Sequence, residues 1–166
     1  MPRRPRSFAP GSATHLTVRG VDDERIFLVD LDYHCYLAIL RKVTARVDWT
    51  IASWCLMPTH VHLVAVLGQD VRVPWAMQTL NSVYAREFNR WHHRHGHVFG
   101  ERYCDREIAT ELHLAAASDY VLRNPVTAGI VGRVEEWLWS GDWRLEPRRI
   151  DAKPAHSRDV LVRPRG

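Results

Sequence analysis

The sequence predicts an α+β fold of the ferredoxin-like kind, a sandwich in which an antiparallel sheet carries its helices on one face. Short segments rich in strand-forming residues are interleaved with longer segments whose apolar residues recur every three or four positions. Their order is strand, helix, strand, strand, helix, strand, helix, which suits an α+β sandwich. With 166 residues, the chain is long enough for one domain with a sizeable core and short for two.

Four strands are expected. The first alternates polar and apolar residues and closes at a glycine, Gly20. The next two are apolar runs separated by Met57-Pro58-Thr59, so we expect them to pair through a tight turn. A short last strand precedes the final helix. The expected ranges are 14–20, 49–56, 60–67 and 101–108.

Three helices are expected. Asp30 or Asp32 can cap the first, and Pro74 suits the first turn of the second. Thr110 begins the third helix, which should end near Asn124 because a proline follows and disfavours the helical conformation before it. The expected ranges are 30–46, 74–91 and 110–124, with a loop over 92–100.

The two ends of the chain differ in composition from the middle. Residues 1–12 and 147–166 are rich in proline and arginine, which predicts flexible basic arms around a domain of residues 13–146. No apolar run approaches the roughly 20 residues of a membrane helix, and the N-terminus lacks the apolar core of a secretory signal. We therefore expect a cytoplasmic protein. Cys35, Cys55 and Cys104 are widely separated and predict ordinary reduced thiols.

The positive charge is carried almost entirely by arginine. The net charge is +4, and Lys42 and Lys153 are the only lysines. Arginine pairs with phosphate in a bidentate way, so a nucleic-acid partner is one interpretation and an ordinary solvated surface is the other. Arg86, Arg90 and Arg94 recur every four residues along an expected helix, where they either track a phosphate backbone or form a solvated face. The histidines of residues 92–97 favour a basic loop over a zinc site, because their spacing is not that of zinc ligands.

His60 and His62 are candidate metal ligands. They stand two positions apart on an expected strand, so both imidazoles project from the same face. Two imidazoles need a third ligand, and Asn124 could supply an amide oxygen. Tyr120 precedes Asn124 by four residues and shares its helix face. The residues alone also allow a structural interpretation, in which Tyr120 is a half-buried helix aromatic and Asn124 ends the helix.

Two segments resemble a known family. Residues 57–63, Met-Pro-Thr-His-Val-His-Leu, resemble the M-P-N-H-V-H-L motif of the REP-associated tyrosine transposases, which are single-tyrosine transposases of the HUH type. Residues 120–129, Tyr-Val-Leu-Arg-Asn-Pro-Val-Thr-Ala-Gly, resemble the family's Y-I-x-x-N-P-V-x-A-G segment. Similarity in the same order extends over about residues 5–143. Thr59 replaces the usual asparagine, and Gly100-Glu101-Arg102 stands where the family more often has Gln-Gly-Arg.

The resemblance implies an activity and a site. His60, His62 and Asn124 match the family's ligands for a divalent cation, Mg²⁺ or Mn²⁺, with Zn²⁺ still possible. Tyr120 matches its nucleophile, which attacks a phosphodiester of single-stranded or hairpin DNA and leaves a 5′-phosphotyrosine link and a free 3′ hydroxyl. Arg102 joins Arg86, Arg90 and Arg94 as an expected DNA contact.

Two other functions stay open at this point. A domesticated descendant would bind hairpins without cutting them, and a metal-dependent hydrolase would use bound water and leave Tyr120 dispensable. The oligomeric state, monomer or homodimer, is also open, because related enzymes complete the site within one chain or exchange the tyrosine helix between two.

Overall fold

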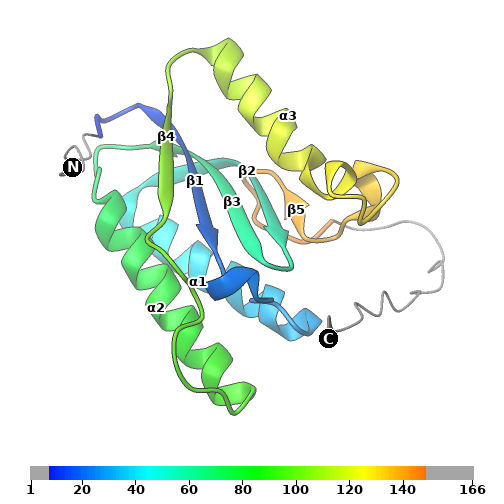
Figure 1. Cartoon of the computed structure of the whole chain (residues 1–166). Helices are drawn as coiled ribbons and strands as arrows, with labels where there is room; N and C mark the ends of the chain where they lie inside the picture. Colours follow the sequence, from blue (N-terminus) through cyan, green and yellow to red (C-terminus); the bar gives the residue numbers. More distant parts are fainter. Residues whose placement is uncertain (1–7, 149–166) are drawn as a thin grey trace.

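A computed structural model describes residues 8–148 (Figure 1). It contains a five-stranded sheet, three α-helices and two short 3-10 helices. The strands are β1 (Ala13–Arg19), β2 (Trp49–Met57), β3 (His60–Leu67), β4 (Cys104–Ile108) and β5 (Ser140–Gly141). The helices are α1 (Asp30–Val47), α2 (Val73–Trp91) and α3 (Glu111–Thr127), with 3-10 turns at Val21–Asp23 and Val134–Glu136. None of the helices in this part of the chain is long and apolar enough to span a membrane.

The sheet is antiparallel throughout and has the strand order β4-β1-β3-β2-β5. The tight turn at Pro58 joins β2 and β3 into a hairpin, as the sequence predicts. In the register of the central strands, Thr17 of β1 lies opposite His62 of β3, and Cys55 of β2 lies opposite His62 from the other side. The predicted α+β class is therefore confirmed, and the strand that carries the histidine pair lies in the middle of the sheet.

One face of the sheet is covered by α1 and α2. The main core combines Leu16, Trp54 and Leu63 from the strands with Tyr36 from α1 and Tyr84 from α2, all of them fully buried. Burial of such large side chains contributes about 1.5–3 kcal/mol each, so this face supplies most of the stabilisation of the domain. The Tyr84 hydroxyl donates to the Ile26 carbonyl, which ties α2 to the segment before α1.

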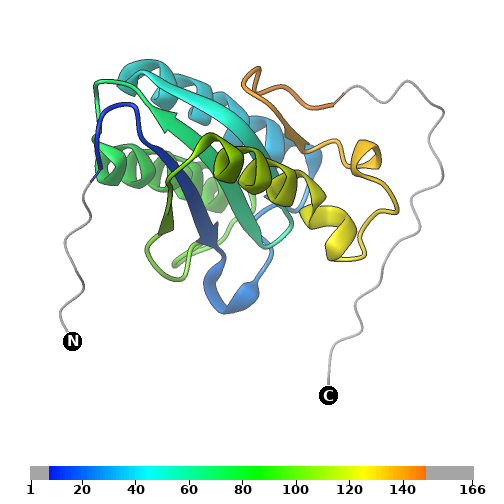
Figure 2. The ribbon, with the colours of Figure 1, turned by 90° about the horizontal axis from the view of Figure 1, so that it is seen from above.

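The third helix lies on the other face. Val121 of α3 joins Cys55, Met57, Val64 and Ile108 in a second apolar cluster, and Figure 2 shows α3 across the sheet from α1. The expectation that the helices share one face holds for α1 and α2 only. As a result α3 lies over the even-numbered residues of β3, which include His60 and His62.

The end of α3 departs from the prediction. Thr110 caps the helix as expected, accepting the His113 amide proton at 3.1 Å. The helix does not stop at Asn124, however, because the buried Pro125 lies inside it and the last turn continues to Thr127. Pro125 has no backbone N–H and so leaves one helical hydrogen bond unmade. Beyond it the helical pattern resumes, since the Ala128 amide donates to the Asn124 carbonyl at 2.9 Å.

The segment after α3 adds a strand that the sequence did not indicate. β5 pairs with β2, and the Trp54 indole donates to the Asp142 carbonyl at 2.8 Å. β4 is shorter than expected and begins at Cys104. Most of the two predicted basic arms, residues 1–12 and 147–166, lies outside the described residues. Phe8 packs against the main core, and the Gly11 amide donates to the Leu67 carbonyl.

Candidate active site

The two histidines of β3 lie side by side on the face covered by α3, as their spacing predicts. Their ring centroids are 4.9 Å apart. His62 is 6% exposed and His60 is half-buried. The Thr59 hydroxyl lies 3.0 Å from Nδ1 of His60. Thr59 replaces the asparagine of the family motif, and here its hydroxyl contacts a candidate ligand directly.

Two residues of β1 complete the histidine cluster, and sequence reasoning missed both. Nε2 of His15 lies 2.9 Å from Nδ1 of His62, and the Thr17 hydroxyl lies 3.2 Å from the same nitrogen. The antiparallel register causes this contact, because Thr17 stands opposite His62 and His15, two positions before Thr17, lies on the same face of β1. The only signal in the sequence was the alternation of Thr-His-Leu-Thr, which places both side chains on one face without saying what they meet.

Helix α3 brings Tyr120 and Asn124 to the histidines. Val121 is buried against the sheet and Pro125 is also buried, and Tyr120 and Asn124, which precede them, contact the histidines. The Tyr120 ring centroid lies 6.1 Å from that of His62 and 6.1 Å from that of His15, edge to face in both cases. Its side chain is 57% exposed, so an incoming strand can reach it. A side-chain hydrogen bond links Asn124 to His60.

The site holds its imidazoles neutral. Burial is the main cause that lowers the pKa of His62 to about 3, and the charges of His60, His15 and Arg19 act in the same direction. Burial also lowers the pKa of His60, helped by Arg19 and opposed by the hydrogen bond with Asn124 and by Asp23. A metal ligand must be deprotonated, so both rings are in the binding form at neutral pH.

The donor set fits a divalent cation held by two imidazoles and an amide. Among residues 8–148, no group of three or more His, Cys, Asp or Glu side chains is arranged to hold a metal, so a third ligand has to be of another type. The amide oxygen of Asn124 is a candidate for that third ligand, and its Nδ2 is buried without a hydrogen-bond partner in the described chain. Nδ1 of His60 contacts the Thr59 hydroxyl, and Nδ1 of His62 contacts His15 and the Thr17 hydroxyl. Nε2 is therefore the candidate ligand atom of each ring.

Two arginines flank the cluster on the same face of the sheet. Arg19 lies opposite His60 in the β1–β3 register, and Arg106 lies opposite His15 in the β1–β4 register. Burial is the main cause that lowers the pKa of His15, and the charge of Arg106 acts in the same direction, as that of Arg19 does for His60. Arg19 pairs with Asp23 at 2.8 Å, whereas Arg106 forms no ion pair with any described residue. Neither arginine was among the expected DNA contacts.

The expected arginine row lies elsewhere. Arg86 and Arg90 belong to α2, across the sheet from the histidine cluster, and both pair with Glu87. Arg94 follows α2 and pairs with Glu24 at 2.7 Å. The structure thus does not bring these three side chains to the histidines, and their contact with DNA stays a prediction.

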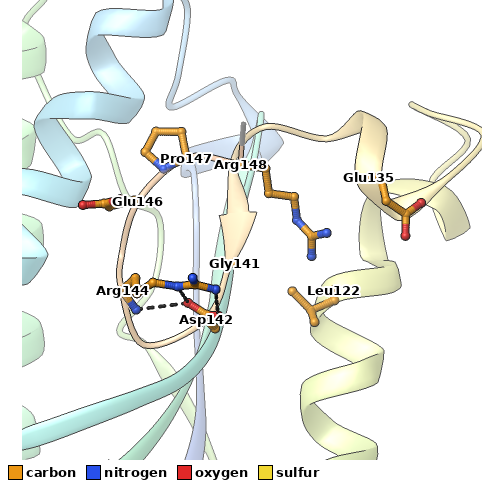
Figure 3. A pocket seen from close by; sticks show the side chains of 8 residues that line it. All are labelled: Leu122, Glu135, Gly141, Asp142, Arg144, Glu146, Pro147 and Arg148. Atoms are coloured by element: carbon orange, nitrogen blue, oxygen red, sulfur yellow. Dashed lines mark hydrogen bonds and ion pairs between the residues drawn. The ribbon is translucent and has the colours of Figure 1, made fainter. Parts of the chain in front are cut away.

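Arg102 lies nearer the candidate site. Together with Arg19, Thr17 and Cys104 it lines a cavity of about 580 Å³ at the end of β1. Asp22, Asp23 and Glu101 line the same cavity, so its charge is mixed. A second cavity of about 490 Å³ lies between α3 and the segment around β5 (Figure 3). In it Arg144 pairs with Asp142, while Arg148 and Leu122 face each other across the gap, and none of the site histidines lines it.

The loop over residues 92–97 forms no metal centre in the described chain. His92 instead pairs with the buried Asp32 at 2.8 Å. Cys35, Cys55 and Cys104 form no disulfide among the described residues.

Comparison with known proteins identifies the family. A family model described as IS200-like transposase matches residues 13–124, and the chain belongs to this family. It is 22% identical over 145 residues to a Haemophilus influenzae protein named as a REP-associated tyrosine transposase, covering 81% of this chain and 82% of that protein. The fold is similar to that of a REP-associated tyrosine transposase solved with a bound REP hairpin, with a TM-score of 0.69, 20% identity, and coverage of 84% and 82%. A Deinococcus radiodurans structure provisionally described as a transposase gives a TM-score of 0.50 at 20% identity, covering 72% of this chain and 95% of that one.

Proposed function

We propose that the chain is a strand transferase for single-stranded or hairpin DNA, in which Tyr120 is the nucleophile and His60, His62 and Asn124 hold a divalent cation, Mg²⁺ or Mn²⁺. Membership of the IS200-like transposases supports the reaction class. The structural relative solved with a REP hairpin supports hairpin DNA as the partner. The proposal depends on one observation: α3 carries a solvent-accessible phenol to within 6.1 Å, ring to ring, of the buried imidazole of His62 and of the half-buried imidazole of His15.

The chemistry is a transesterification in which one phosphoester replaces another. The phenolic oxygen of Tyr120 attacks the phosphorus of a phosphodiester, the bond from phosphorus to the 3′ oxygen breaks, and the phenolic proton passes through solvent to the departing 3′ oxygen. The products are a 5′-phosphotyrosine link and a strand with a free 3′ hydroxyl. A second 3′ hydroxyl can reverse the step and join strands, since the ester is conserved on the enzyme.

The site residues divide the remaining tasks. A bound divalent cation supplies charge stabilisation to the phosphate oxygens. The imidazoles of the half-buried His60 and the buried His62 stay neutral at working pH and therefore remain available as ligands. Asn124 adds an amide without adding negative charge, which keeps the site attractive to phosphate.

Arg19 and Arg106 are proposed to hold the strand on the α3 face. They flank the histidine cluster at opposite ends, and Arg106 has no competing carboxylate among the described residues. A guanidinium in this position can bind a backbone phosphate next to the one that is cleaved.

Replacing the nucleophile tests the proposal. Wild-type protein and Tyr120→Phe are incubated with an end-labelled hairpin oligonucleotide carrying single-stranded flanks, with and without Mn²⁺. The proposal predicts scission by wild type with Mn²⁺ only, and none by Tyr120→Phe. Equal scission by Tyr120→Phe would favour a hydrolase that uses bound water, and hairpin binding without scission by wild type would favour a non-cleaving DNA-binding protein.

A further inference from the structure

Three polar atoms from two neighbouring strands lie within hydrogen-bonding distance of one another on the Nδ1 side of His62. Nδ1 of His62 lies 2.9 Å from Nε2 of His15 and 3.2 Å from the Thr17 hydroxyl, and these two partners are 3.4 Å from each other. His62 is 6% exposed, so water has little access to replace either partner. The contact is built into the sheet, because the β1–β3 register fixes Thr17 directly opposite His62.

His62 can hold either of its two neutral tautomers in this triangle. In the first, His62 carries its single proton on Nδ1 and donates it to His15 and Thr17, which leaves a lone pair on Nε2 of His62. In the second, His15 carries its proton on Nε2 and donates it to Nδ1 of His62, whose own proton then occupies Nε2 and blocks that atom as a ligand. The side chains behind His62 therefore determine whether it can bind a metal.

We propose that His15 and Thr17 are positioning residues that accept the Nδ1 proton of His62 and thereby keep its Nε2 as the ligand atom. Ligating histidines generally donate their other ring N–H to a fixed acceptor, which sets both the tautomer and the ring orientation. Here a second imidazole and a hydroxyl take the place of the more usual carboxylate or backbone carbonyl. The inference rests on the proposed function as far as the metal is concerned, whereas the tautomer of His62 is a property of the metal-free protein.

His15 acts through His62 and not as a further ligand. The two nitrogens of an imidazole point to different sides of the ring, so a partner of Nδ1 would stand on the side of the ring away from a cation bound at Nε2. Direct ligation by Asn124 and outer-layer support by His15 are thus compatible, and they make different predictions for substitution.

The first test reads the tautomers directly. Ring nitrogen shifts are measured by long-range proton–nitrogen correlation on the metal-free, ¹⁵N-labelled full chain, with His62→Gln and His15→Gln used for assignment. We expect a protonated Nδ1 and an unprotonated Nε2 on His62, and an unprotonated Nε2 on His15. A protonated Nε2 on His62 in the wild-type protein overturns the proposal, whatever the metal binding proves to be.

The second test measures metal affinity without DNA. Mn²⁺ binding is followed by electron paramagnetic resonance for wild type, His15→Phe, Thr17→Val and Thr17→Ser, with His97→Phe and Thr50→Val as exposed controls of the same chemistry. We expect His15→Phe to weaken Mn²⁺ binding by about 10- to 100-fold and Thr17→Val to weaken it less. Thr17→Ser keeps the hydroxyl and should bind Mn²⁺ as wild type does. Unchanged affinity in His15→Phe, or a loss as complete as in His62→Ala, overturns the proposal.

The two tests separate this inference from the proposed function. Wild-type protein that binds no Mn²⁺ but shows the expected His62 tautomer contradicts the proposed metal site and supports the positioning role. If His15→Phe binds Mn²⁺ with the affinity of wild type and cleaves DNA at the same rate, the result supports the proposed function and contradicts the positioning role.

Discussion

Nε2 of His92, at the end of α2, lies 2.8 Å from the carboxylate of Asp32, in the first turn of α1. Asp32 is fully buried, and its other oxygen accepts the backbone amides of Leu28 and Val29 at 2.8 and 3.0 Å. One carboxylate thus caps α1 and joins the two helices that cover the first face of the sheet. His92 therefore has a structural role in joining α1 and α2.

Removing the buried carboxylate should destabilise the fold. Asp32→Ala leaves two backbone donors and His92 without their acceptor, so we expect the free energy of unfolding to fall by about 3 kcal/mol. Urea denaturation of the metal-free protein measures the change. Asp30→Ala, in the same turn but exposed, is the matched control and should cost less than about 1 kcal/mol. Equal losses in the two variants would show that Asp32 has no special role.

The arginines on the histidine face should matter more for DNA than those on α2. Arg106→Ala should weaken binding of a single-stranded oligonucleotide and reduce the slope of log K against log salt by about 1, because one phosphate contact is lost. Fluorescence anisotropy at several salt concentrations measures both quantities. Arg86→Ala serves as the comparison, and a larger effect from Arg86→Ala would place the strand on the α2 side instead.

The buried histidine makes stability depend on pH. The pKa of His62 is lowered to about 3 in the folded chain, against 6.5 for a free histidine. Between these values the unfolded chain binds a proton that the folded chain does not, so stability falls as pH is lowered. From pH 7.5 to 5.0 this group alone should cost about 2 kcal/mol. Urea denaturation should therefore show a smaller pH dependence for metal-free His62→Gln than for wild type, and an equal dependence would contradict the neutral buried imidazole.

The ligand histidines should separate cleavage from binding. His60→Ala or His62→Ala removes one of three proposed ligands, so scission with Mn²⁺ should fall below detection while hairpin affinity stays within about threefold, since few contacts to the strand are lost. Gel-shift and cleavage assays on the same oligonucleotide measure the two effects, with the exposed His97→Ala as control. Full activity in either variant would exclude the proposed metal site.

Local periodicity made much of this fold and site predictable. The alternation of β3 places His60 and His62 on one face whatever the strand pairs with, and the helical spacing of Tyr120 and Asn124 does the same for α3. Local rules failed where packing outweighed them. Pro125 is expected to end α3, yet the helix continues with this residue buried inside it, and hydrogen bonding resumes beyond it.

Contacts between distant segments could not be predicted from one sequence. His15 meets His62 only through the β1–β3 register, across 47 positions of the chain. Arg106 reaches the same face through the pairing of β1 with β4. β5 is two residues long, too short to have a period of its own, and it is defined by its contacts with β2. The side of the sheet that α3 covers likewise follows from tertiary packing.

Mapping a covalent DNA adduct tests the central claim most directly. Wild-type protein is incubated with a hairpin oligonucleotide and Mn²⁺, denatured, and digested with trypsin and nuclease before mass spectrometry. Cleavage after Arg106 and Arg123 gives the peptide of residues 107–123, whose single tyrosine is Tyr120. We predict a nucleotide linked through its 5′ phosphate to that tyrosine. An adduct on another residue, or metal-dependent scission with no adduct, would contradict the assignment of Tyr120 as the nucleophile.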